Sequence, residues 1–301
     1  MAGQTLARAA IAAVAAAGIA AAGCFSAGAG RDGKTTLKVC TYNIRLDSRR
    51  DEASGNGWSA RRGDLAALVR KMAPDAGGMQ EVTPGQRRYL EQALPEYAFL
   101  GDHRGSDRVS GEASPVFYRK DRFDEEESGT FWLSETPDTP GRKGWDAAYP
   151  RICTWALLRD RKTGRRFCLA NAHTDHIGAI ANKEGMLLIL RRMKKFSKGA
   201  PVVFTGDHNC IETDEPARAV SALLDNATRV SRKTAEGPWR TYNAWIWKER
   251  ESSPAKDGAR VDYIYVSRGT EVLDCKTWAD ARPGLKQYPS DHFPVTATVS
   301  F

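Results

Sequence analysis

The sequence is poor in cysteine and has no cysteine pair at metal-binding spacing. Six cysteines occur in 301 residues, and after the N-terminal stretch they are far apart: Cys40, Cys153, Cys168, Cys210 and Cys275. Without a CxxC pair, a zinc site is not expected. Most of the five lie in apolar runs and are interpreted as buried small hydrophobes. Cys153 and Cys168, on strands expected to be neighbours, are the best candidates for a disulfide.

The sequence also lacks runs of basic residues, internal repeats and an interdomain linker. Its formal net charge is +8. Without residues 1–30, which hold one basic residue and no acidic one, 44 basic residues face 37 acidic ones, a net charge of +7. A basic balance suits a polyanionic partner such as nucleic acid, phospholipid or inositol phosphate. It is equally compatible with ordinary solubility, because no basic stripe concentrates the charge.

The apolar stretch over residues 9–24 is too short and too alanine-rich for a membrane-spanning helix. It follows Arg8 and ends in small residues, which is typical of an export signal. Its last residues resemble a lipoprotein processing site at Cys24, although Ala21 stands where leucine is usual. The alternatives are a lipid anchor at Cys24 and simple cleavage between Cys24 and Gly30. We therefore expect a leader over residues 1–30 and an exported domain over residues 31–301, either secreted, periplasmic or lipid-anchored.

The stretch Pro201-Val-Val-Phe-Thr-Gly-Asp-His-Asn209 reads as a strand buried on both faces that stops at Gly206. Asp207 and Asn209 follow, which predicts either a plain Asx turn or a polar site held by a rigid strand. Further strands are expected at 37–45, 76–81, 114–119, 123–132, 151–159, 166–173, 261–266, 271–278 and 294–301. Helices are expected at 59–72, with Ser59 as N-cap, and at 84–94, 179–196 and 216–224. This alternation predicts a four-layer α/β/β/α sandwich with two central, mostly antiparallel sheets.

Polar residues of similar type follow strand after strand in this reading. They are Asn43, Glu81, Glu112, His173, Asp207 with Asn209, Asp262, and Asp291 with His292. If they converge, they supply two imidazoles, several carboxylates and two carboxamides. Oxygen ligands without thiolates favour Mg²⁺, Mn²⁺ or Ca²⁺ over zinc. A water activated beside such a metal, with imidazoles held by carboxylates, can cleave a phosphate ester.

Six short motifs carry a resemblance to a known family. They are Thr41-Tyr-Asn-Ile-Arg45, Gln80-Glu81, Asn171-x-His173-x-Asp175-His176, Gly206-Asp-x-Asn209, Val261-Asp-Tyr-Ile264 and Ser290-Asp-His292. In this order they resemble the endonuclease/exonuclease/phosphatase superfamily, the DNase I-like fold, from about Leu37 to Phe301. Gly111-Glu-x-x-Pro-x-Phe-Tyr-Arg119, Phe131-Trp-Leu-Ser-Glu135 and Gly144-Trp-Asp146 are similar to an exported bacterial branch of that superfamily.

The resemblance implies a role for each matching residue. Glu81 would be the principal metal ligand, with Asn43 beside it and Asp291 completing the site. His292 would contact the phosphate, oriented by Asp262, while Asp207 would align or deprotonate the attacking water. The base is either Asp207 or His292. Asn209 would hold a phosphate oxygen, and His173, supported by Glu112, would be a second imidazole on the phosphate.

Some residues depart from the pattern or stay open. Gly77-Gly78 replaces a bulky apolar pair, Thr174 replaces leucine, and His208 stands where an aromatic or apolar residue is usual, so it is either a packing change or a further substrate contact. Arg151 is either a phosphate clamp or a salt-bridge partner. The remaining candidates are aromatic or imidazole side chains that fit a substrate, a lipid, the core or plain surface equally well: Trp239, Trp245, Trp247, His103 and His176.

The sequence thus predicts a Mg²⁺-dependent phosphoesterase, with Mn²⁺ or Ca²⁺ as alternatives, acting as a monomer on phosphodiester bonds, in nucleic acid by preference. Two rival enzymes are a sphingomyelinase-like phospholipase and an inositol-polyphosphate phosphatase. One rival of another class is a catalytically silent surface-binding module. Fold alone does not choose among them.

Overall fold

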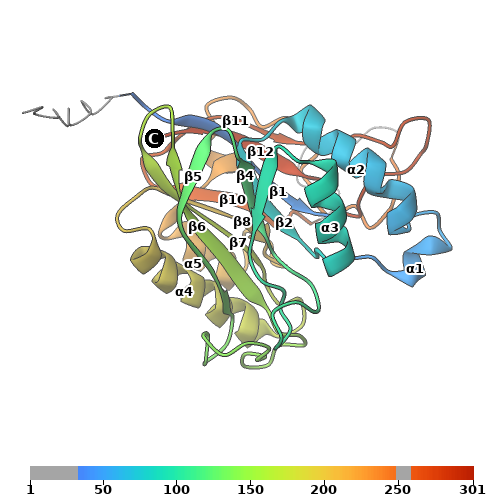
Figure 1. Ribbon diagram of the computed structural model, residues 1–301, viewed down its shortest axis with the longest axis horizontal. Helices are drawn as coiled ribbons and strands as arrows, with labels where there is room; N and C mark the ends of the chain where they lie inside the picture. The colour runs from blue at the N-terminus through green and yellow to red at the C-terminus, as the bar shows by residue number, and fades with distance from the viewer. Residues whose placement is uncertain (1–32, 249–258) are drawn as a thin grey trace, which may run out of the picture. The chain divides into compact units, whose positions relative to one another are not determined.

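A computed structural model describes residues 33–248 and 259–301, and there two six-stranded sheets pack against each other (Figure 1). The predicted leader over residues 1–30, with Cys24, lies outside the described residues. In the part of the chain that is described, no helix combines the length and the apolarity needed to cross a bilayer.

The first sheet has the strand order β11-β12-β1-β2-β4-β3. β1 and β2 run parallel, and all other neighbours are antiparallel. The chain's first strand therefore lies between its last strand and β2. The strands are β1 (Thr36–Asn43), β2 (Ala76–Gln80), β3 (Tyr97–Leu100), β4 (Val116–Arg119), β11 (Glu271–Thr277) and β12 (Val295–Ser300).

The second sheet has the order β5-β6-β7-β8-β10-β9, again with one parallel pair, β7 and β8. The predicted hairpin over residues 151–173 is confirmed as β6 and β7. β8, the strand expected to be buried on both faces, is buried at all six positions. The strands are β5 (Phe123–Trp132), β6 (Ile152–Asp160), β7 (Arg166–His173), β8 (Val202–Asp207), β9 (Leu224–Asn226) and β10 (Asp262–Ser267).

Three apolar layers separate the sheets and helices. The central one fills the space between the two sheets. On the outer face of the first sheet lie α2 (Trp58–Met72) and α3 (Pro84–Ala93), and on that of the second lie α4 (Ala179–Phe196) and α5 (Glu215–Ser221) (Figure 1). α1 (Arg49–Glu52) and α6 (Ala227–Val230) are single turns. The predicted four-layer α/β/β/α fold is confirmed.

Buried hydrogen bonds join the two sheets near the ends of β2 and β7. Asn171 of β7 accepts a hydrogen bond from Gln80 Nε2 at 2.6 Å and donates to the carbonyl oxygens of Met79 and Pro115 at 2.7 and 3.0 Å. Gly78 makes room for it, because a Cβ there would lie 2.1 Å from Asn171 Cγ. Of the glycine pair that departs from the family pattern, Gly78 is therefore matched to a buried amide, and a Cβ at Gly77 would instead meet the Cys40 carbonyl oxygen.

Some local expectations were wrong. The N-cap of α2 is Gly57, not Ser59, and α1 interrupts the loop expected at residues 47–57. Cys153 and Cys168 are free and buried. They lie on paired strands, but Cys153 is opposite Ala172, four residues beyond Cys168. That offset is about 13 Å along a strand, too far for a disulfide.

The pairing directions explain why the polar residues converge. The parallel pairs β1–β2 and β7–β8 end together, at Asn43 with Gln80 and at His173 with Asp207. β10 is antiparallel to β8 and begins at Asp262, directly opposite Asp207. One end of the sandwich therefore collects side chains from both sheets.

Candidate active site

Asp262 and His292 form a buried pair at the centre of the candidate site. Asp262 Oδ2 lies 2.8 Å from His292 Nδ1, and both side chains are buried. Burial alone would lower the pKa of His292, but the Asp262 and Asp207 carboxylates outweigh it and hold that pKa well above its usual value. The imidazole is therefore oriented and kept charged, with Nε2 3.7 Å from Asp207 Oδ2.

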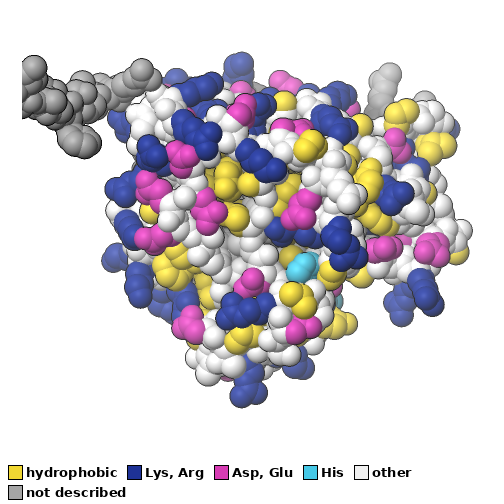
Figure 2. Space-filling model, viewed as in Figure 1, with side chains coloured by type: hydrophobic (Ala, Val, Ile, Leu, Met, Phe, Trp, Pro, Cys, Tyr) yellow, Lys and Arg dark blue, Asp and Glu magenta, His cyan; other side chains and the backbone are white. Residues whose placement is uncertain are grey.

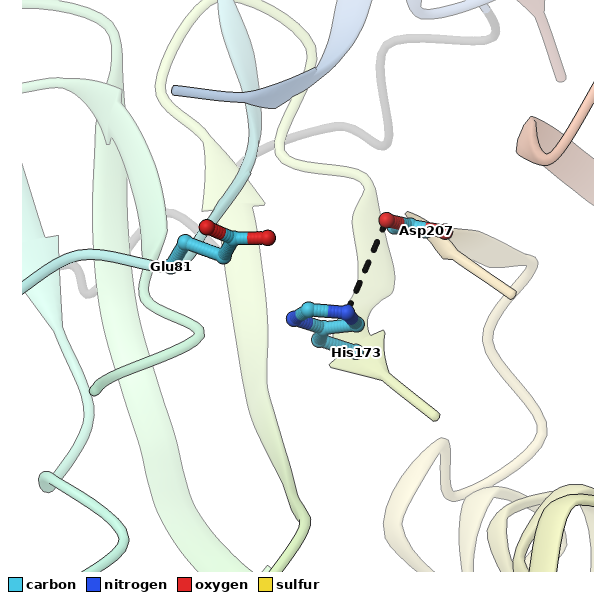
Figure 3. A group of neighbouring side chains, drawn as sticks. All are labelled: Glu81, His173 and Asp207. Carbon is cyan, nitrogen blue, oxygen red and sulfur yellow. Dashed lines mark ion pairs between the residues drawn. The ribbon is translucent and has the colours of Figure 1, made fainter. Parts of the chain in front are cut away.

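A second imidazole approaches the same carboxylate. His173 Nε2 lies 3.5 Å from Asp207 Oδ2, as Figure 3 shows together with Glu81. Burial, and then the positive charges of Arg151 and His292, hold the pKa of His173 well below its usual value. Its Nδ1 is buried without a hydrogen-bond partner among the described residues. The surroundings thus favour opposite forms of the two rings, the protonated form of His292 and the neutral form of His173.

The Asp207 carboxylate is approached by both imidazoles, those of His173 and His292. Burial, helped by the negative charge of Asp262, raises its pKa to about 7. A carboxylate with a pKa near neutrality can accept a proton during turnover. Its second oxygen, Oδ1, accepts a hydrogen bond from the Asn209 backbone N–H at 3.0 Å.

Glu81 faces Asp207 across the site, from the end of the first sheet. Its backbone has a φ of +63°, in the left-handed region that non-glycine residues seldom adopt. Asn43 Nδ2 donates to Glu81 Oε1 at 3.0 Å and to Asp207 Oδ2 at 2.9 Å, so it joins the two carboxylates. The Leu46 backbone N–H holds the other Glu81 oxygen at 2.9 Å.

The donor atoms suit a divalent cation. Glu81, His173 and Asp207 each offer a ligand atom within 4.8 Å of the others, and Asp207, Asp262 and His292 form a second such group. Carboxylate and imidazole donors without thiolate fit Mg²⁺ or Mn²⁺. The set expected from the sequence, Glu81 with Asn43 and Asp291, overlaps this cluster at Glu81.

Asp291 and Asn209 lie at the edges of the cluster. Asp291 Oδ2 is 3.6 Å from Arg45 Nη1, and burial raises the pKa of Asp291. Asn209 has a φ of +46°, and its Nδ2 donates to the Thr174 carbonyl at 3.0 Å. The predicted Asx turn therefore exists, and it also places the Asn209 amide beside Asp207.

Glu112 does not contact His173 by a hydrogen bond. Its carboxylate instead binds Arg104, with N–O distances of 2.7 and 3.0 Å. Burial raises the pKa of Glu112, against the effect of Arg104. Glu112, Arg104, Arg151 and His173 line one small recess, but the partner of the Glu112 carboxylate in that recess is Arg104 and not His173.

Several open residues have a structural explanation. Arg151 is a salt-bridge partner of Asp175 at 3.3 Å and also contacts His176 Nδ1 at 2.9 Å. His103 is buried, with its Nδ1 3.0 Å from the Gly111 carbonyl oxygen. His208 is fully buried, so the suggested substrate contact is wrong. It stacks between Phe204 and two tyrosines, and burial lowers its pKa to about 3.

The sequence reasoning missed three contributors. Arg45 anchors Asp291, and the motif Thr41-Tyr-Asn-Ile-Arg45 had marked its position without giving it a role. Arg61 is fully buried and donates to the carbonyls of residues 44, 45, 46, 56 and 289, which ties the Asn43 loop to the loop before Asp291. Tyr242 lies with its ring 5.0 Å from that of His292, and no sequence signal singled it out.

Comparisons with known proteins agree with this geometry. The model of the Endonuclease/Exonuclease/phosphatase family matches residues 40–292. A solved structure of a protein of that family from Bacteroides thetaiotaomicron is 34% identical, with a TM-score of 0.82, covering 89% of this chain and 99% of that chain. The mannosyl-6-phosphatase of Bacteroides thetaiotaomicron VPI-5482 is also 34% identical, with a TM-score of 0.81, covering 88% and 100%.

Curated proteins are more distant. Nocturnin of Drosophila melanogaster is 22% identical over 284 residues, 79% of this chain and 41% of that protein. An uncharacterized mimivirus protein is 29% identical over 205 residues, 57% of this chain and 30% of that protein. The chain therefore spans less than half the length of the curated relatives it matches.

Proposed function

The chain belongs to the endonuclease/exonuclease/phosphatase family, and we propose that it is a metal-dependent phosphoesterase whose catalytic centre is built around Asp207. The observation that carries this proposal is the meeting of two imidazoles of opposite protonation preference on one buried carboxylate, with Glu81 alongside. A charged donor, a neutral ring and a carboxylate of raised pKa are what hydrolysis of a phosphate ester needs.

The residues divide the work as follows. Glu81, with Asn43 and Asp291, would hold a divalent cation such as Mg²⁺, which supplies positive charge against the phosphate oxygens. Asn43 would have to turn its amide over to offer Oδ1, because Nδ2 now faces the carboxylates. Asp207 takes the proton of the attacking water, since its pKa is close to 7.

The imidazoles stabilise the phosphate as charge builds on it. His292, kept positive by Asp262, donates from Nε2 to a phosphate oxygen. His173 contributes a neutral N–H, and the Asn209 amide holds another oxygen from the far side of Asp207. Every one of these side chains is held by a strand end or a buried partner, so little reorganisation is needed during the reaction.

A hydroxyl-rich phosphate monoester, such as a sugar phosphate, is the first substrate candidate. The support is the 34% identity to a protein named mannosyl-6-phosphatase, over 88% of this chain. A pocket of about 320 Å³ beside Asn209 agrees with it. Three carboxylates and one lysine line that pocket, Asp175, Asp214, Glu215 and Lys183. The exposed carboxylates of Asp214 and Glu215 can accept hydrogen bonds from sugar hydroxyls and repel a further phosphate, whereas the Asp175 carboxylate is buried and bonded to Arg151.

Phosphodiester bonds in nucleic acid are the second candidate, supported by the net charge of +8. Much of this charge is locally neutralised. Figure 2 shows Lys and Arg interspersed with Asp and Glu on the face in view, and Arg159 and Arg161 both pair with Asp124. A continuous basic groove is therefore not the basis of this candidate. Phospholipids and inositol phosphates are further candidate substrates and are included in the screen below.

One screen tests the proposal. Purified protein is incubated with mannose 6-phosphate, inositol phosphates, single-stranded RNA, single- and double-stranded DNA, and sphingomyelin, each with Mg²⁺, Mn²⁺ or Ca²⁺ and with chelator. We expect Mg²⁺-dependent release of phosphate, fastest from the sugar phosphate, and loss of turnover in Asp207→Asn. Cleavage of nucleic acid without attack on monoesters would reverse the order of the candidates. No turnover on any substrate with any divalent metal would leave the silent binding module.

We also propose that the chain is an exported monomer of a bacterial branch of the family. The support for export is the apolar stretch over residues 9–24 with its small-residue end, and the support for the bacterial branch is the 34% identity to the Bacteroides thetaiotaomicron structure. Cell fractionation of the expressed chain, with and without residues 1–30, tests export, and labelling with palmitate tests a lipid anchor at Cys24. Light scattering tests the monomer.

A further inference from the structure

A second pocket, of about 340 Å³, opens beside the catalytic end of the sandwich. Its wall is the segment 231–239, which runs along the edge strand β11. Three backbone hydrogen bonds join them, from Arg232 N to Val272 O, from Glu236 N to Cys275 O and from Thr277 N to Glu236 O. Gly237 has a φ of +83°, and a Cβ there would meet the Thr277 carbonyl. The pocket therefore has a fixed backbone frame.

The lining is strongly basic. It contains Arg229, Arg232, Lys233 and Arg260 against one acid, Glu236. Arg229 and Arg232 pair with Glu212 and Glu271, and Glu236 pairs with Lys276. Among the described residues, Lys233 and Arg260 have no carboxylate within ion-pair distance. Within residues 33–248 and 259–301, two positive charges of the pocket are therefore without a carboxylate partner.

Arg260 is the unusual member, because it is only 2% exposed. Its guanidinium donates to neutral oxygens alone, the Trp239 carbonyl and the hydroxyls of Thr277 and Thr228. Among the described residues its Nε is buried without a hydrogen-bond partner, and so is Ser231 Oγ, which belongs to the same lining. A buried cation costs stability when no anion accompanies it. Two unused donors and two uncompensated cations in one recess are the features of an anion site.

We propose that this pocket binds a tetrahedral oxyanion, a phosphate or sulfate group, at a place separate from the catalytic centre. The pocket is close to that centre along the chain: Arg260 is two residues before Asp262, about 7 Å of extended backbone. Thr241 Oγ1, just after the pocket wall, accepts the N–H groups of Val261 and Asp262, each at 3.0 Å. The bound group is either a further phosphate of a substrate or an independent ion, and both use the same chemistry.

Inorganic sulfate is a suitable probe, because it is not hydrolysed. Trp239 lines the pocket, so its fluorescence should change as sulfate binds, and Trp239→Phe identifies that part of the signal. The main variant is Lys233→Glu, at an exposed position that should not affect folding. The matched control is Lys194→Glu, an exposed lysine of α4 with the same change of charge. Arg260→Lys, checked by circular dichroism, tests the buried guanidinium.

We expect saturable sulfate binding in the wild type, weakened about tenfold or more in Lys233→Glu, as for loss of a charge-assisted contact, and unchanged within about twofold in Lys194→Glu. Arg260→Lys should also weaken sulfate binding, because a single ammonium group cannot replace the several N–H donors of the planar guanidinium. Absence of saturable binding, or equal affinity in the wild type and Lys233→Glu, overturns the proposal.

Kinetics then distinguish the two sources of the oxyanion. If it is an independent ion, sulfate affects the rate on 4-nitrophenyl phosphate in the wild type beyond its competition at the catalytic centre, and in Lys233→Glu only that competition remains. If it belongs to the substrate, Lys233→Glu raises KM for a substrate with two phosphates and leaves KM for a monophosphate unchanged. Because sulfate binding is measured without turnover, its outcome is independent of the proposed enzyme activity.

Discussion

Replacing Gly78 by alanine should weaken the junction between the two sheets. The new methyl group would lie 2.1 Å from Asn171 Cγ and 2.5 Å from Thr205 Oγ1, well inside van der Waals contact. Neither atom can retreat freely, because Asn171 makes hydrogen bonds to both sheets and all these side chains are buried. The amide must therefore leave its place.

The cost has two parts. Overpacking a well-packed interior costs about 1–3 kcal/mol, and each buried polar group left without its partner adds about 1–3 kcal/mol. The Met79 carbonyl oxygen loses the Asn171 donor, whereas the Pro115 carbonyl oxygen also accepts the Met79 N–H at 3.0 Å and keeps that bond. We expect Gly78→Ala to lower the free energy of unfolding by about 2–6 kcal/mol, a large share of the 5–15 kcal/mol typical of a domain.

Urea unfolding followed by tryptophan fluorescence measures this loss. The matched control is Gly63→Ala in α2, where a Cβ meets nothing within 4 Å, so a gain of about 0.5–1 kcal/mol is expected. In the Asn171→Ala background the cost of Gly78→Ala should shrink, because the clash with the Asn171 amide is gone and only the contact with Thr205 Oγ1 remains. A cost below about 0.5 kcal/mol, or an equal cost in both backgrounds, would refute the reasoning.

Three further predictions concern buried polar groups. Asp262→Asn keeps the shape but removes the charge that supports the catalytic imidazole, so kcat should fall about 10²- to 10⁴-fold; a loss under tenfold in steady-state kinetics would contradict that role. His208 has a pKa of about 3 when folded and about 6.5 when unfolded, so below pH ~6.5 only the unfolded state gains its proton. As the pH is lowered, the free energy of unfolding of the wild type should therefore decrease by up to about 1.4 kcal/mol per pH unit from this group. Urea unfolding at pH 7, 6 and 5 should show a weaker pH dependence of that free energy in His208→Phe, and the same pH dependence in both proteins would contradict the prediction. Arg61→Lys should cost about 2–5 kcal/mol in the same assay, because several buried carbonyls lose their donor, whereas the exposed Arg62→Lys should change less than about 0.5 kcal/mol.

Much of the fold could be predicted because its signals are local. The run of apolar residues before Gly206 and the hairpin over residues 151–173 each carry their pattern within a few positions. β3 and β9 were missed, since four and three residues are too short for a periodic signal. The N-cap of α2 was predicted at Ser59 because serine has a capping side chain. The helix begins at Trp58, and its N-cap Gly57 makes no side-chain hydrogen bond.

The candidate site was anticipated through its strand ends. Asn43, Glu81, His173 and Asp207 follow strands whose pairing brings them to one edge, and the residue types alone suggested this. The sequence did not show which of these side chains have their partners outside the site. Glu112 forms an ion pair with Arg104, and His208 packs against Tyr265. Partners such as these are distant in sequence or depend on strand pairing, and they decide where a side chain lies. The disulfide failed for the same reason, as strand register is a long-range property.

The position of β1 between β2 and β12 has a consequence for the growing chain. Asn43 and His292 are contributed by the first and last thirds of the sequence, so a nascent polypeptide carries no hydrolytic centre until its final strand has been made. Closing contacts of such long sequence separation is slow. Recovery of phosphate hydrolysis after dilution from urea should therefore lag behind recovery of helical circular dichroism, and the enzyme's own turnover becomes a reporter of the last step of folding.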